Sequence, residues 1–134
     1  MTLGRRSAVQ YLHGRYPDVV PPPGEEVDLG ALHLEVFWFQ AHTCDVIDEH
    51  DDAAARRCFE TIYRLLIEGD PDVRRAVCEH YVIPHLIFHE DLAWAQERMP
   101  PVLAELCAMA RERAVDAVRG SLPQRSEPDG GQFK

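Results

Sequence analysis

Gly69-Asp70-Pro71 is the stretch that decides the fold of this chain, because it lies between two segments whose apolar residues recur at helical spacing. Aspartate is favoured at a helix N-cap, and proline is tolerated at the first helical position because its missing N–H needs no partner there. Glycine directly before this pair is typical of a left-handed cap at the end of the preceding helix. The three residues therefore predict a corner at which one helix ends and the next begins.

The same helical periodicity extends over most of the chain, and no segment shows the apolar–polar alternation that is typical of a strand. Asp28 stands at a further N-cap position, Asp51 and Asp52 are expected to open a helix because the positive end of its dipole favours them, and Gly120 is expected to cap the last helix. Pro84 predicts either a kink or the start of a new helix. The pattern predicts an all-α fold with helices over residues 3–15, 28–48, 51–68, 71–82, 85–98 and 102–119.

A chain of 134 residues fits a single domain. We expect residues 1–120 to form one bundle of five to six helices, with a HEAT-like helix-turn-helix corner at residues 69–71. Residues 121–134 contain two prolines, two glycines and few apolar residues, which predicts a disordered tail. The chain has no apolar run long enough to cross a bilayer and no apolar stretch typical of a secretory signal, so we expect a cytoplasmic protein.

The negative charge of the chain is concentrated in one segment. Nine carboxylates and no lysine or arginine lie between Glu25 and Asp52, and the formal net charge of the whole chain is −9. Such a block repels nucleic acid and anionic membranes, so we expect neither as a partner. It attracts basic partners, although a solvated face that only aids solubility is the alternative. The carboxylates expected to contact a basic partner are Glu35, Asp45, Asp48, Glu49, Asp51 and Asp52.

The histidines offer a possible metal site. His85 and His89 are four residues apart and share a helical face, with Glu90 beside them and His80 one turn earlier. Pro84 separates His80 from His85, however, and no H-E-x-x-H signature accompanies them. We therefore expect packing or surface histidines and neither a bound metal nor another cofactor. The alternative is a metal-binding protein or enzyme that uses His80, His85, His89 and Glu90.

Motifs for covalent catalysis are missing from the sequence. No serine or cysteine lies in a glycine-flanked nucleophile elbow, and no glycine-rich phosphate loop is present. We therefore expect a protein that is not an enzyme and has no catalytic residues. Trp38 and Trp94 occupy helical positions that suit packing in the core, and an exposed binding anchor is the alternative.

The residues around the corner resemble a known family. The stretch from Leu65 to Val77, LLIEGDPDVRRAV, is similar to the core of a small helical domain-of-unknown-function family common among bacterial immunity proteins of polymorphic toxin systems. It also resembles a HEAT-type helical hairpin, in which an Asp-Pro corner precedes Val-Arg-x-Ala. The resemblance to immunity proteins implies a cytoplasmic protein that neutralises a cognate toxin by occluding its active site or holding it inactive.

The resemblance and the charge pattern lead to the same hypothesis. Many toxins of this kind cleave nucleic acid and have basic clefts, in which a carboxylate-rich helix can take the place of phosphates. The hypothesis is an immunity-type binding protein whose acidic helical surface contacts a basic toxin domain. A metal-binding protein or enzyme and a helical-repeat adaptor that binds another protein are the alternatives. A toxin-domain gene immediately upstream would favour the immunity hypothesis.

Overall fold

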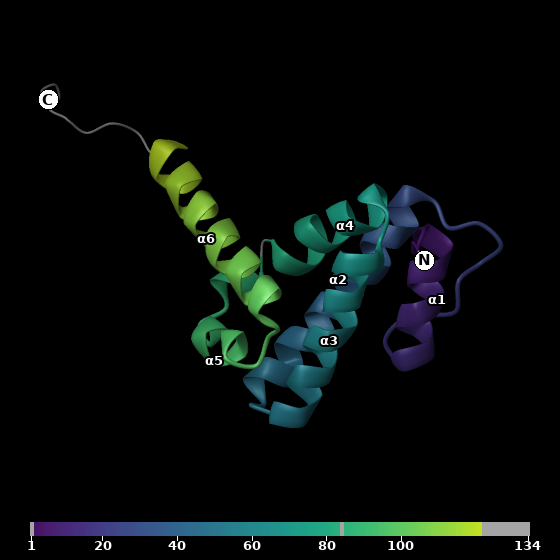
Figure 1. The fold of residues 1–134 in the computed structure, drawn as a ribbon, viewed down its shortest axis with the longest axis horizontal. Helices are drawn as coiled ribbons and strands as arrows, with labels where there is room; N and C mark the ends of the chain where they lie inside the picture. The colour runs from purple at the N-terminus through teal and green to yellow at the C-terminus, as the bar shows by residue number, and fades with distance from the viewer. Residues whose placement is uncertain (1, 84, 122–134) are drawn as a thin grey trace, which may run out of the picture.

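A computed structural model describes residues 2–83 and 85–121, and all of its regular secondary structure in these ranges is helical (Figure 1). The prediction of an all-α fold with five to six helices is confirmed. The elements of the described residues are α1 (Arg5–Arg15), α2 (Leu29–Asp48), α3 (Asp52–Glu68), α4 (Pro71–Val77), the π-helical turn η1 (Cys78–Val82), the 3₁₀ turn η2 (Leu86–Phe88), α5 (Leu92–Gln96) and α6 (Pro101–Ser121).

The predicted N-caps Asp28 and Asp70 are confirmed, and Asp51, expected only to open its helix, is a third N-cap. In each case the aspartate carboxylate accepts a hydrogen bond from a backbone N–H three residues later, which satisfies a donor that the helix itself leaves unpaired. The bonds run to Asp28 from Ala31 at 2.7 Å, to Asp51 from Ala54 at 3.1 Å, and to Asp70 from Val73 at 2.9 Å.

The corner at Gly69 forms, but the predicted left-handed conformation of this glycine is wrong. Gly69 is extended, with φ −73° and ψ 151°. It lies against Leu3, whose backbone N–H donates to the Glu68 carbonyl at 2.6 Å and whose carbonyl accepts from the Asp70 N–H at 2.9 Å. A Cβ at position 69 would stand 2.5 Å from Val73 Cγ1, so glycine is required by close packing and not by its backbone angles.

Several predicted helix bounds also need correction. The single helix expected over residues 85–98 is wrong, because the described chain forms η2 and α5 with a break between them. At this break the Asp91 N–H donates to His89 Nδ1 at 3.0 Å, a local bond that competes with helix formation. Gly120 does not cap the last helix, since α6 continues to Ser121. The predictions for Pro84 and for residues 122–134 lie outside the described residues.

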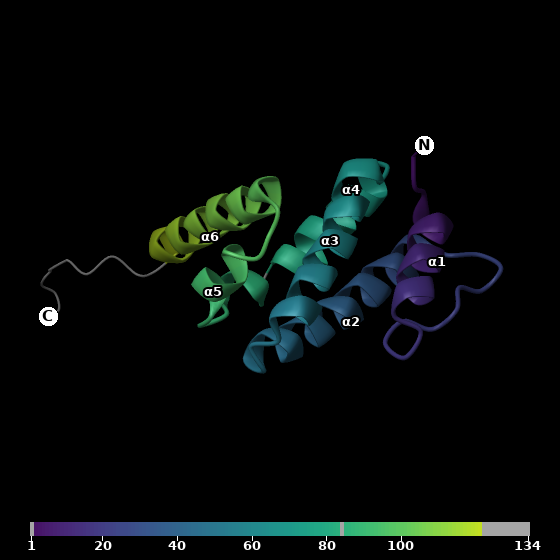
Figure 2. The ribbon, with the colours of Figure 1, turned by 60° about the horizontal axis from the view of Figure 1, so that its bottom comes forward.

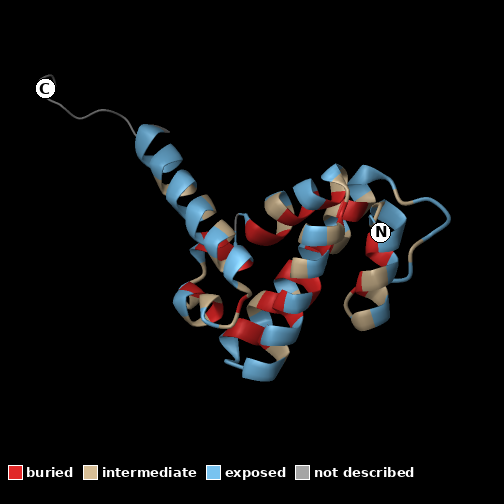
Figure 3. Ribbon diagram, viewed as in Figure 1, coloured by how far each residue is buried: buried red, intermediate tan, exposed pale blue. Residues whose placement is uncertain are grey.

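Helix α2 is at the centre of the packing, where it contacts α1, α3, α4 and η1 (Figures 1 and 2). Buried residues lie on the faces that these helices turn toward one another, whereas the far part of α6 is exposed (Figure 3). Within the core, Tyr81 donates to Thr43 Oγ1 at 3.0 Å and Thr43 donates to the Phe39 carbonyl, so these buried hydroxyls are satisfied. None of the described helices combines the length and the apolar character that crossing a membrane requires.

Candidate functional site

The acidic segment forms most of α2, the turn after it and the start of α3, and neighbouring elements divide its carboxylates into groups. On one side, His89 Nε2 donates to Asp48 Oδ1 at 2.7 Å. Arg98 Nε lies 2.6 Å and Arg56 Nε 3.1 Å from the two Asp52 oxygens. Asp48 and Asp52 therefore have partners within the molecule. We call these two residues the paired side.

The paired side also holds the α2–α3 turn against α5. The hydrogen bonds from Arg56 and Arg98 hold the pKa of the Asp52 carboxyl below its usual value. The Arg98 guanidinium lies 4.0 Å from the centroid of the Trp94 ring, on which His50 is stacked at 4.7 Å. Trp94, expected in the core, is half-buried and belongs to this contact between elements.

Asp45 and Glu49 lie near Asp48 at the end of α2 and project into solvent. They are four residues apart, so they share a helical face, and both are exposed. Neither carboxylate has an ion pair within the part of the chain that the structure describes. Their charges are therefore available to a partner.

Apolar side chains continue the same face toward the start of α2. Leu34 and Trp38 are 46% and 38% exposed, and Ala41 is also exposed. The prediction that Trp38 packs in the core is wrong, because the buried stripe of α2 runs through Leu32, Val36 and Phe39 on a different side. We call the exposed surface the Trp38 face; at helical spacing it comprises Leu34, Trp38, Ala41, Asp45 and Glu49.

The two remaining carboxylates of the predicted acidic surface have other surroundings. Glu35 is half-buried, its Oε2 has no hydrogen-bond partner in the described structure, and burial raises its pKa. Asp51 is the N-cap of α3 and lines, with Glu49, a hollow of about 380 Å³. Because Asp18 and Arg57 also line this hollow, it presents both signs of charge. The six predicted contact carboxylates thus do not form one uniform surface.

The structure does not bring together the alternative metal group of His80, His85, His89 and Glu90. His89 is bonded to Asp48, and the His85 ring lies 6.1 Å from the Phe37 ring. His80 belongs to η1, and the residue after this turn, Ile83, is extended, as expected for a residue before proline. The chain therefore leaves the helical path between His80 and His85, and no single helical face carries all four residues.

His80 instead meets His33 of α2, a residue that sequence reasoning missed. The two rings are edge to face with centroids 4.4 Å apart, and His33 Nδ1 lies 3.9 Å from Glu79 Oε1. Burial and the neighbouring His33 lower the pKa of His80. Among the described residues, these three form the one group whose potential ligand atoms all lie within 4.8 Å of one another. Nothing local in the sequence indicates this pairing, because α2 and η1 are far apart along the chain.

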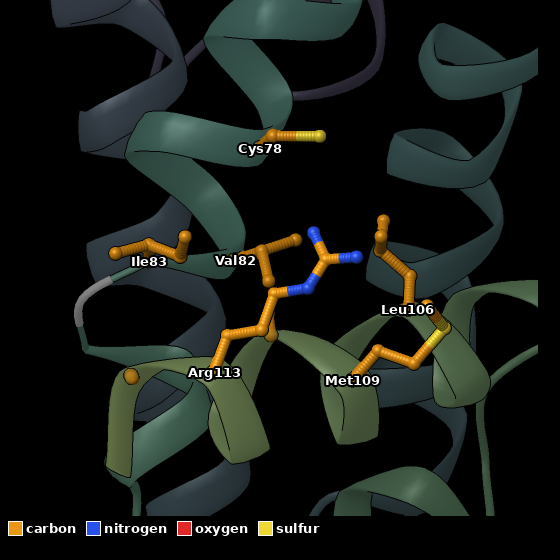
Figure 4. Close-up of a pocket in the computed structure, with 8 residues that line it drawn as sticks. Cys78, Val82, Ile83, Leu106, Met109 and Arg113 are labelled. Atoms are coloured by element: carbon orange, nitrogen blue, oxygen red, sulfur yellow. The ribbon is translucent and has the colours of Figure 1, made fainter. Parts of the chain in front are cut away.

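An apolar groove of about 450 Å³ lies between η1 and α6 (Figure 4). Cys78 and Val82 line it from η1, and Met109 and Arg113 line it from α6. Burial, followed by the charge of Glu79, raises the pKa of the Cys78 thiol. The pKa values of the other three thiols are also raised by burial, so the reactive thiolate form is disfavoured in all of them.

A comparison with known protein families finds one match. The model of a family described as a domain of unknown function, DUF7674, matches residues 9–113. No curated protein and no solved structure matches the chain significantly. The matched range includes the whole Trp38 face and the group of His33, Glu79 and His80.

Proposed function

The chain belongs to the DUF7674 family, a domain of unknown function, and from its own surface we propose that it is an immunity-type protein that binds and neutralises a cognate bacterial toxin. In this proposal the Trp38 face covers a basic cleft of the toxin. One observation carries the proposal: an exposed tryptophan shares a helical face with two carboxylates, Asp45 and Glu49, that have no ion-pair partner in the described structure.

The apolar residues of the Trp38 face support the proposal that the partner is a protein. Tryptophan is enriched among the residues that dominate binding energy at protein interfaces, and such residues lie near the centre of the contact with polar residues around them. On α2, Trp38 has Leu34 one turn before it and Asp45 two turns after it. The arrangement supplies an apolar anchor with an acidic border.

The charge of the border supports a basic partner. Asp45 and Glu49 carry negative charge that the described fold does not neutralise, so their field reaches approaching molecules. Charges at the edge of an interface mainly raise the association rate, and salt screens them over about 8 Å at physiological ionic strength. A toxin that binds nucleic acid through a basic cleft has the complementary potential.

The paired side is unsuited to the same role. Contact between Asp52 and a toxin would compete with Arg56 and Arg98, and contact at Asp48 would compete with His89. An arginine or lysine of the partner would contribute less binding free energy at Asp48 or Asp52, because the internal bonds of these carboxylates must first be broken. We therefore assign the contact charges to Asp45 and Glu49, which narrows the surface predicted from the sequence.

Under this proposal we expect a toxin-domain gene next to the gene for this chain, and co-expression with that toxin domain tests it. Cells that make the toxin should survive when they also make the wild-type chain, and they should die with D45K/E49K. The matched control is E60K/E105K, which makes the same change of net charge at two exposed carboxylates of α3 and α6 and should still protect. Circular dichroism should show unchanged helical content in both variants. Protection by D45K/E49K at the wild-type level would overturn the assignment.

A second variant tests the apolar anchor. W38A should weaken binding of the purified toxin domain by about 2 kcal/mol or more, as expected for a tryptophan at the centre of an interface. Trp38 is 38% exposed, so the fold should tolerate its loss. An unchanged affinity measured by calorimetry would place the interface elsewhere on the protein.

A further inference from the structure

We propose that His33, Glu79 and His80 bind one divalent transition-metal ion, for which zinc is the best match. The proposal is independent of toxin binding and differs from the sequence-based expectation of no metal. It rests on the position of three donor side chains from two elements, α2 and η1, which the fold packs against each other.

The separation of the donors is close to what a metal requires. In tetrahedral zinc sites the nitrogen and oxygen ligands lie about 2.1 Å from the ion, which places neighbouring donors about 3.4 Å apart. His33 Nδ1 and Glu79 Oε1 are 3.9 Å apart, too far for a hydrogen bond but only about half an ångström too far for a shared zinc ion. The Glu79 side chain is 54% exposed and can close this gap by rotating about its own bonds.

His33 makes no side-chain hydrogen bond within the described structure. Its side chain is 17% exposed, and its Nε2 atom is buried without a hydrogen bond. A histidine with neither nitrogen in a hydrogen bond, facing a second imidazole and a carboxylate, is in the environment of a metal ligand.

The backbone at the site is also unusual. Residues Cys78–Val82 form a π-helical turn, in which the Ile83 N–H donates to the Cys78 carbonyl at 3.1 Å. Such wide turns are rare and occur frequently at functional sites. The turn follows α4 without interruption and carries both Glu79 and His80. It thereby places two consecutive donors opposite His33.

The donor set determines the class of ion. Two imidazoles and one carboxylate match zinc sites that keep a position open, whereas magnesium and calcium prefer ligand sets made of oxygen. A hollow of about 420 Å³, lined in part by Gly30, Phe37 and His80, leaves room for a water molecule as a further ligand.

Titration calorimetry of the untagged full-length protein with zinc chloride tests the site. The wild type should bind one zinc ion per chain, and H33A and H80A should each abolish this binding. E79Q, which changes an exposed side chain and keeps its size, should weaken binding at least about tenfold. The matched control H85A/H89A removes two other histidines and should bind zinc as the wild type does.

Cobalt provides a second measurement that depends on coordination itself. Addition of Co²⁺ to the wild type should produce visible absorption bands of a protein-bound ion, and E79Q should change these bands while H33A and H80A remove them. Circular dichroism checks that each variant is folded, and E79Q decides the question if the histidine variants are not. Less than one zinc per chain in the wild type, or unchanged binding by E79Q, would overturn the proposal.

Discussion

Two helix junctions, α3–α4 and α2–α3, look alike in the sequence and are built differently. Both begin their second helix with an aspartate N-cap, Asp70 in one and Asp51 in the other. The α3–α4 corner contains a glycine, yet that glycine is extended. The α2–α3 turn contains no glycine, yet His50 has φ 54°. Local sequence therefore identified where the helices begin, while packing decided how the preceding helices end.

The two junctions also differ in how they use their polar groups. At the α3–α4 corner, Glu68 and Asp70 form backbone hydrogen bonds with Leu3, and no space remains for a side chain at Gly69. At the α2–α3 turn, the Asp51 N–H reaches back to the Val46 carbonyl at 3.3 Å in a Schellman-type ending. The turn leaves Glu49 exposed to solvent, so only this junction provides charge for a partner.

The largest expected effect is at the close-packed corner. G69A should lower the free energy of unfolding by about 3 kcal/mol, because the new methyl group would overlap Val73 Cγ1. The control is G14A in α1, where a Cβ would meet no heavy atom within 4 Å. This change should leave stability equal or raise it by up to about 1 kcal/mol. Urea denaturation measures the free energy of unfolding of both variants. Equal values for G69A and G14A would show that packing does not require glycine at position 69.

The next largest effect on stability is expected at His50, the residue of the α2–α3 turn with a left-handed backbone conformation. The His50 ring stacks on Trp94 and bonds to Asp91 at 3.0 Å, contacts that both H50A and H50G remove. Only glycine also relieves the left-handed conformation, so H50G should be more stable than H50A by about 1 kcal/mol. If thermal unfolding finds H50A as stable as H50G, His50 is not held in a strained conformation.

The caps should have an effect of similar or smaller size. D70A should lower the free energy of unfolding by about 1 kcal/mol, because the Val73 N–H loses its acceptor. D45A removes an exposed carboxylate that makes no ion pair in the described structure, and its effect should stay within about 0.5 kcal/mol. Chemical denaturation measures the stability of both variants and so compares an aspartate that caps a helix with one that makes no ion pair in the described structure. A larger loss in D45A would show that this residue stabilises the fold.

The smallest effects are expected in the dependence of stability on pH. The folded-state pKa of Asp52 is lowered by its bonds to Arg56 and Arg98, so its contribution is present above about pH 4 and is lost as pH falls through the lowered pKa. The folded-state pKa of Glu35 is raised by burial, so its ionisation opposes folding as pH rises through that value. At pH 7, D52N should therefore be less stable than the wild type and E35Q more stable.

Urea unfolding at pH 7 and pH 3 measures both differences. The gap between D52N and the wild type and the gap between E35Q and the wild type should each narrow toward pH 3. A stability gain in D52N at pH 7 would contradict the assigned pairing with Arg56 and Arg98. A loss in E35Q at pH 7 would show that the Glu35 carboxylate has a favourable partner.

The sequence predicts those parts of the fold that depend on neighbouring residues. The predicted caps Asp28 and Asp70 and the α3–α4 corner follow from side chains that bond to backbone groups three residues away. The break before α5 was missed, because it depends on a side-chain bond of His89 that helical periodicity does not reveal. The left-handed conformation expected for Gly69 is wrong; glycine is required because a Cβ there would overlap Val73, a contact that depends on how α4 packs after the corner.

The candidate sites depend on contacts between distant residues. His89 and Asp48 are 41 positions apart, so no local pattern indicates that this carboxylate is already bonded. His33 meets His80 through the packing of α2 on η1, and the sequence offered His85 and His89 in its place. Helical spacing shows that the residues of the Trp38 face lie on one side of α2. It does not show whether that side of an apolar helix is buried or exposed.

Association kinetics with the cognate toxin domain test most directly which carboxylates contact the partner. D45N/E49Q and D48N/D52N change the net charge equally but remove charge from the Trp38 face and the paired side, respectively. D45N/E49Q should lower the association rate constant about tenfold at low salt and flatten its salt dependence, whereas D48N/D52N should change it by less than about twofold. Equal slowing by both variants, or a larger effect of D48N/D52N, would contradict the account.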